Sequence, residues 1–370
     1  MAAKKNVLVG LCVVVVLDLC VLAGAAKGKT DSGKVASDAY KLRMQGKVDD
    51  ARTLLEQAIQ ENPHNAAAHY ELARTKFHMA LGGPKGLEEG IRDAQQSIVK
   101  AIENDPNNVI YHFFEGYIAF FQAYISLMQN QPDTKENVAR LCGAFESALK
   151  LKPDYRQAML YLVEIYGTLP EDKGGDKSKA EQYAKQLEGM DKVFGAKARS
   201  ILLPGEANRV GYWQNVLKDN EGNADVLEEL GKAYLGADKV NDAALCFEKV
   251  AKISPEKSLL FMDLSIYHTW SAMRAGNDST LLQKAIASGD AAVTRYLDCK
   301  LVLPMQAYAL GVQYKYKAHS GHKEQADELL KKAETLDPYF SKATGAPNPD
   351  LFIPPDEISH NHRYLFRPIQ

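Results

Sequence analysis

The sequence has few of the residues and motifs that carry catalysis. Of its five cysteines, Cys12 and Cys20 fall in an apolar N-terminal stretch, and Cys142, Cys246 and Cys299 are widely spaced. No C-x-x-C occurs, so the cysteines predict neither a disulfide framework nor a zinc site. A phosphate-binding glycine loop, G-x-S-x-G and H-E-x-x-H are also lacking. We therefore expect a protein that is not an enzyme and that holds no metal or cofactor.

The sequence also lacks an excess of charge of either sign. Lys and Arg number 45 against 47 Asp and Glu, which gives a formal net charge of −2 over 370 residues. A near-neutral chain has no overall field that attracts nucleic acid or anionic lipid, and nucleic-acid binding is not expected. A single core rarely grows beyond about 250–300 residues, so this length predicts two domains or a repeat array.

Residues 1–26 have the pattern of a secretory signal peptide or an N-terminal anchor. Lys4 and Lys5 precede an apolar run from Val7 to Leu17, and the small residues Ala23-Gly24-Ala25 follow it. We expect cleavage after Ala25, which would make the protein periplasmic or secreted.

Two other fates of this segment remain open. An uncleaved anchor would need Asp18 inside the bilayer, at a cost of about 3 kcal/mol on insertion scales. Acylation at Cys20 would need small residues before the cysteine, where Leu17-Asp18-Leu19 stands instead. Membrane attachment is therefore expected only through the N-terminal segment, if it is retained.

One pattern recurs five times along the chain. It consists of a small or apolar residue, a large apolar residue four positions on, Ala or Val three further and Pro five further. These offsets place the first three residues on one helical stripe, and the proline marks the end of the helix. The copies end at Pro63, Pro106, Pro153, Pro255 and Pro338.

A second amphipathic helix precedes each stripe, most clearly around Leu227, Leu230, Gly231 and Tyr234. Together with Ala243, Phe247 and Pro255, these residues resemble the tetratricopeptide repeat, abbreviated TPR, from about Asp38 to Phe340. The resemblance implies an all-α, right-handed solenoid of about six to seven helix pairs. Pro153 and Pro255 are 102 residues apart, three periods of 34, so two degenerate repeats should lie between them, around 180–191 and 213–219.

This resemblance divides the chain into four parts. The leader at 1–26 and a linker at 27–36 precede a solenoid at 37–343, and a Pro-rich tail covers 344–370. Insertions at Gly82–Gly86, Asn130–Pro132 and Lys173–Asp176 should fall between the two helices of a pair. The aromatic residues of the irregular tail are unlike a disordered segment, so we expect it to dock on the solenoid or on a partner.

The most unusual segment is Tyr111–Tyr124, half of whose residues are aromatic. Its aromatics cover more than the stripe that an amphipathic helix needs. Alignment of the repeats places part of them on the concave face, as an aromatic-lined groove with one cation. The predicted binding residues, for a protein or a ligand, are Tyr70, Arg74, Phe77, Phe113, Tyr117, Phe120 and Tyr124. The alternative interpretation is a central helix that is buried on both sides.

These observations favour a non-enzymatic protein-interaction scaffold outside the cytoplasm, with a protein or peptide partner bound in the concave groove. A second hypothesis is a small-molecule-binding component that accompanies a periplasmic transport system. A third is a structural subunit of an envelope complex, held to its neighbour by the Pro-rich tail.

Overall fold

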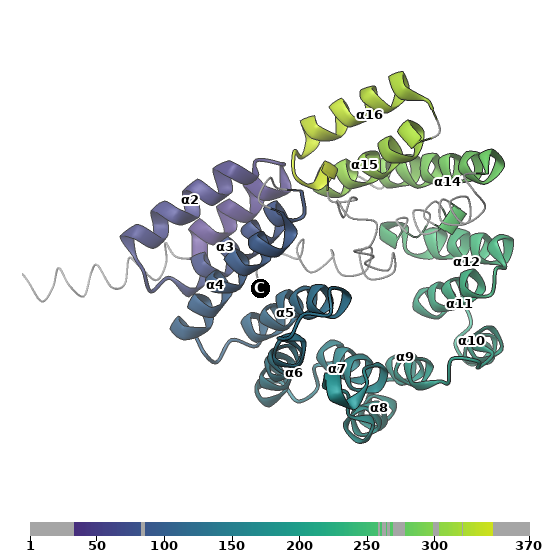
Figure 1. Cartoon of the computed structure of the whole chain (residues 1–370), viewed down its shortest axis with the longest axis horizontal. Helices are drawn as coiled ribbons and strands as arrows, with labels where there is room; N and C mark the ends of the chain where they lie inside the picture. Colours follow the sequence, from purple (N-terminus) through teal and green to yellow (C-terminus); the bar gives the residue numbers. More distant parts are fainter. Residues whose placement is uncertain are drawn as a thin grey trace, which may run out of the picture.

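The fold is built from paired α-helices (Figure 1). The computed structural model describes residues 33–82, 86–257, 260, 264, 267–268, 278–298, 303–319 and 321–342. Within these ranges the chain contains helices and turns and no strand. The predicted leader at 1–26, most of the linker and the tail at 344–370 lie outside the described residues.

Seven helix pairs are complete in the described part of the chain, and α14 (Ser279–Asp298) lies between the sixth and seventh pairs. The first pair joins a helix at 33–44 to α2 (Val48–Glu61). The others are α3 (Ala66–Ala80) with α4 (Leu87–Asn104), α5 (Val109–Met128) with α6 (Thr134–Leu151), α7 (Arg156–Thr168) with α8 (Lys177–Met190), α9 (Lys192–Leu202) with α10 (Arg209–Lys218), α11 (Ala224–Gly236) with α12 (Val240–Ile253), and α15 (Leu303–His319) with α16 (Lys323–Leu336). Short 3₁₀ turns are η1 (Glu171–Lys173), η2 (Pro255–Lys257) and η3 (Phe340–Lys342). The predicted all-α solenoid is confirmed.

The repeated prolines mark the ends of the second helices, as expected. Helices α2, α4, α6, α12 and α16 each end two residues before the proline of their copy. The next helix commonly begins with an asparagine cap, which satisfies a backbone N–H that has no partner within the helix. The Asn65 side chain accepts from the N–H of Ala68, and Asn108 accepts from that of Ile110.

Small residues allow the two helices of a pair to pack closely. A Cβ added at Gly231 would come within 2.4 Å of the Phe247 ring, and one at Gly116 within 2.7 Å of the Phe145 ring. Both phenylalanines are fully buried. The recurring stripe is therefore the surface through which each second helix packs on its partner.

The two degenerate repeats are present between Pro153 and Pro255. Helices α7 and α8 form one, and the shorter α9 and α10 form the other. The insertions at 82–86, 130–132 and 173–176 each join the two helices of a pair, as predicted. Two of them meet, because the Lys173 ammonium lies 3.5 Å from the side-chain oxygen of Asn130.

The solenoid curves until its last pair lies against its first pairs (Figure 1). Helices α5, α7 and α9 face the inside of this arc, and α6, α8 and α10 lie outside it. We call the contact of residues 336–342 with the first two pairs the seam. The Tyr339 hydroxyl donates to the carboxylate of Asp49, at 3.1 Å from both oxygens and 290 residues away in sequence.

The seam is closely packed and buried. His78 Nε2 lies 2.9 Å from Asp337 Oδ2, with both side chains fully buried, and the Phe340 ring lies 4.9 Å from the ring of His78. At Gly46, whose φ is +74°, a Cβ would come within 1.9 Å of the Leu336 carbonyl oxygen. Side chains at this glycine are thus excluded by both backbone conformation and space. The solenoid is closed into a ring by its own ends.

Candidate functional site

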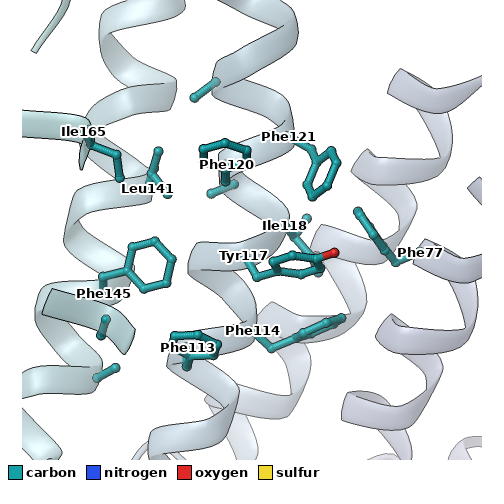
Figure 2. Packing of buried hydrophobic residues seen from close by; sticks show 14 of the residues in the cluster. Phe77, Phe113, Phe114, Tyr117, Ile118, Phe120, Phe121, Leu141, Phe145 and Ile165 are labelled. Atoms are coloured by element: carbon teal, nitrogen blue, oxygen red, sulfur yellow. The ribbon is translucent and has the colours of Figure 1, made fainter. Parts of the chain in front are cut away.

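Six of the seven predicted binding residues lie in the interior. The exposed fractions are 6% or less for Tyr70, Arg74, Phe77, Phe113 and Tyr117, and 9% for Phe120, while Tyr124 is partly buried. Figure 2 shows the rings of α5 between Phe77 of α3 on one side and Phe145 of α6 on the other. This arrangement agrees with the alternative interpretation of the sequence, in which α5 is a central helix buried on both sides.

Contacts between rings explain why so many aromatics occur on one helix. Phe77 lies 5.1 Å from Phe121 and 5.4 Å from Tyr117, measured between ring centroids. On the opposite side of α5, Phe113 lies 5.4 Å from Phe145. Edge-to-face and tilted pairs at these distances add about 0.5–1.5 kcal/mol beyond the burial of their area. The aromatics join three consecutive repeats, and none of these rings is available to a partner without unpacking the core.

Arg74, expected as the cation of a groove, belongs to a buried ion triad instead. Its guanidinium donates to Glu71 Oε2 at 3.0 Å, and Arg43 Nε donates to Glu71 Oε1 at 2.9 Å, with all three side chains fully buried. The ring of Tyr40 lies 5.3 Å from the Arg74 guanidinium and 5.6 Å from that of Arg43. Burial lowers the pKa of Arg43, and the charge of Glu71 opposes this. The triad joins the first helix to α3.

The described surface has a large hollow elsewhere, over helices α2 to α6. Its volume is about 830 Å³, within the range of ligand sites in proteins. We call it the outer hollow. Apolar side chains contribute Ile59, Leu72 and Val99, and charged side chains contribute Glu56, Lys76, Lys100, Glu115 and Arg140. Val99 is one of the few large apolar side chains that are exposed in the described part of the chain, at 36%.

An unsatisfied polar atom lies in the wall of the outer hollow. Gln95 is 6% exposed, and its side-chain oxygen has no hydrogen-bond partner among the described residues. Its amide donates to Glu115 Oε1 at 3.4 Å. Burial raises the pKa of Glu115, while the electrostatic interactions with His112 and Arg140 and the Gln95 hydrogen bond act in the opposite direction. A buried acceptor without a donor costs about 1–3 kcal/mol, and this oxygen is itself shielded from solvent, so the cost falls on the folded chain.

The sequence contains one indication of this site, two polar residues within the apolar stripe of α4. Gln95 and Ser97 lie beside Ala94 and Ile98, on a face of α4 that is otherwise apolar. A buried amide at such a position usually has a hydrogen-bonding purpose. The aromatic segment is the stronger signal in the sequence, and sequence alone does not show which side of α5 meets another helix.

Two further findings concern other kinds of site. Among the described residues, no helix is long and apolar enough to cross a membrane. No group of three or more His, Cys, Asp or Glu side chains in the described part of the chain could hold a metal ion.

The fold defines a helical-repeat protein in which consecutive helix pairs stack on one another. The model of the tetratricopeptide-repeat family matches residues 42–80, which span the end of the first helix, α2 and α3. This part of the chain is thus a tetratricopeptide repeat, and the helix pairs that follow it continue the same stacked arrangement. Proteins of this class generally mediate protein–protein interaction and are typically non-enzymatic scaffolds.

Several solved structures resemble the chain at low identity. A tetratricopeptide repeat protein from Parabacteroides merdae is 15% identical, with a TM-score of 0.46 over 82% of this chain and 99% of its own. A thermophilic TPR protein from Thermus thermophilus is 17% identical, with a TM-score of 0.36 over 64% and 98%. The MamA protein is 18% identical, with a TM-score of 0.31 over 62% and 95%. No curated protein matches, and no function is carried over from these structures.

Proposed function

We propose that the protein is a non-enzymatic interaction scaffold whose outer hollow binds an extended peptide segment of a partner protein. The observation that carries this proposal is the preformed hollow over α2 to α6, which apolar and charged side chains line together. An extended peptide presents backbone N–H groups along its length as well as apolar and charged side chains, so it offers groups of each kind to this lining.

The other side chains of the hollow suit the same kind of ligand. Val99, Leu72 and Ile59 form apolar surface for one or two side chains of a peptide. Lys76, Lys100 and the other charged groups line the same hollow, so a ligand with both apolar and polar groups would find partners for each. Interfaces with an apolar centre and a polar rim are usual for protein recognition. Because the hollow is preformed by packed helices, little ordering is needed on binding.

The proposed place of action is outside the cytoplasm, in the periplasm or as a secreted protein. The support for this location is the leader pattern at residues 1–26, with Lys4 and Lys5 before an apolar run and small residues after it. The mature N-terminus, measured by mass spectrometry on protein from its own host, tests this part of the proposal separately from binding.

Binding is tested by selecting peptides against the purified protein by display and measuring their affinity for two variants. Val99→Glu places a charge in the outer hollow, whereas Leu245→Glu places one on α12, at an exposed apolar residue outside the hollow. We expect Val99→Glu to weaken the selected peptide at least tenfold and Leu245→Glu to leave it unchanged. Circular dichroism should show the same helical signal for both variants, because neither side chain is buried.

Equal effects of the two variants would contradict the proposal, since the peptide would then bind elsewhere. A failure to select any peptide, together with a thermal shift produced by a metabolite, would instead support the small-molecule hypothesis.

A further inference from the structure

The seam fixes the position of Lys342, where the described part of the chain ends. Lys342, the last described residue, lies beside the loop after α3, and its Cβ would be 3.0 Å from a Cβ added at Gly82. Helix α3 also contributes Lys76 to the outer hollow. Six residues of α-helix measure about 9 Å, so the described chain ends close to the hollow. Without the seam, Lys342 would belong to the last repeat alone, with nothing to hold it near the first ones.

We infer that residues 350–357 of this chain occupy the outer hollow and compete there with the partner peptide. The inference rests on the proposed function and names an occupant that is present in every molecule. From Lys342 to Asp350 the chain has eight residues, which reach about 26 Å when extended. This reach exceeds the roughly 20 Å of α3 between Gly82 and His69, which also lines the hollow.

The chemistry of residues 350–357 complements that of the hollow. Their sequence is Asp-Leu-Phe-Ile-Pro-Pro-Asp-Glu, an apolar centre with acidic residues at both ends. Leu351, Phe352 and Ile353 would cover the apolar side chains, and the acidic ends would meet Lys76, Lys100 and Arg140. The lining has three Lys and Arg side chains against two Glu, and Lys100 also pairs with Glu103 at 2.6 Å in an exposed contact. An exposed pair of this kind contributes little, so a carboxylate of the segment can take the place of Glu103.

The two prolines and the tether both favour this occupant. Pro354 and Pro355 restrict the segment to extended conformations, so it loses little freedom on binding. A short tether gives an effective concentration on the order of millimolar. A segment with an intrinsic affinity of about 0.1 mM would therefore fill the hollow in about nine molecules of ten. A partner would then bind about tenfold more weakly than it would to an empty hollow.

The test uses the full chain with Phe352→Asp and Ile353→Asp together, which removes the apolar centre of the segment. Its matched control is Tyr364→Asp with Phe366→Asp, which makes the same kind of change further along the tail. The affinity of the display-selected peptide is measured for both. We expect about tenfold tighter binding to the first variant and wild-type affinity for the control.

A synthetic peptide of residues 347–360 provides the second readout. It should bind the Phe352→Asp, Ile353→Asp chain, and adding Val99→Glu to that chain should abolish the binding. The inference would be refuted if the selected peptide bound the wild type, the Phe352→Asp, Ile353→Asp chain and the Tyr364→Asp, Phe366→Asp control with equal affinity and the synthetic peptide did not bind. That result would leave the proposed function standing. If instead the selected peptide is insensitive to Val99→Glu, the proposed function itself fails.

Discussion

The closure of the ring predicts that a single substitution opens the solenoid without melting its repeats. Phe340 is fully buried, with its ring 4.9 Å from that of His78 and 5.7 Å from that of Tyr308. Replacing a buried phenylalanine with alanine costs about 3–5 kcal/mol. Part of this cost falls on the contact with Tyr308 of α15, which the open form would keep. Since every 1.4 kcal/mol is a factor of ten, Phe340→Ala should lower the ratio of closed to open molecules by at most about two to nearly four orders of magnitude.

The remaining helix pairs should survive this change. In a repeat protein each repeat packs mainly on its neighbours, so the seam is a separate contact added at the ends. We expect Phe340→Ala to raise the radius of gyration measured by small-angle X-ray scattering, with an unchanged far-ultraviolet circular dichroism spectrum.

Phe247→Ala is the matched control. Phe247 is equally buried, but it belongs to α12 and packs on Gly231 of α11, within one helix pair. This variant should lower thermal stability by a similar amount and leave the radius of gyration of the folded protein as it is. An unchanged radius for Phe340→Ala, with reduced thermal stability alone, would refute the idea that the seam is a releasable contact.

Three further predictions concern the interior. Phe113→Glu and Tyr117→Glu should each lose helical signal in circular dichroism, because burying an unpaired carboxylate in an aromatic core costs several kcal/mol; retention of the signal would mean that these rings are accessible. Glu71→Gln should lower the free energy of unfolding by about 3–5 kcal/mol, because it leaves two buried guanidinium groups without their carboxylate. A denaturant titration measures this loss, and a loss below about 1 kcal/mol would contradict a buried ion triad. Burial raises the pKa of Cys142 from 9.0 to about 11 and also raises that of Cys246. At pH 8 the thiolate form of Cys142 is therefore about a hundredfold less populated than in the unfolded chain, and alkylation of Cys142 should be slower by a similar factor. The unfolded state loses this proton first, so the contribution of Cys142 to stability is full below pH 9 and falls between pH 9 and about 11; fast alkylation of the folded protein or a flat stability profile over that range would count against its burial.

The repeats could be predicted from sequence because each is defined by residues close together in the chain. Pro63 and its equivalents end helices where local geometry forbids continuation, and Gly231 with Phe247 marks the close packing of one pair. These signals lie within about 34 residues of each other, so they can be recognised without knowledge of the whole fold. The same reasoning located the two degenerate repeats from the spacing of Pro153 and Pro255.

The seam and the outer hollow could not be predicted in this way. Nothing local in the sequence indicates that Asp49 and Tyr339 meet across 290 residues, because that contact depends on the accumulated curvature of all the pairs between them. The aromatic residues of α5 illustrate the same limit. Their number shows that the helix is surrounded, but whether by neighbouring helices or by a ligand depends on the packing of three consecutive repeats.

The central claim is that the outer hollow is the site where a peptide binds. The most direct test places the photo-crosslinking residue benzoylphenylalanine at position 99 in one preparation and at position 245 in another, each irradiated with the selected peptide. Mass spectrometry then identifies the attached peptide. The account predicts attachment from position 99 and none from position 245. Attachment from position 245 alone, or from neither position while the peptide is bound, would contradict it.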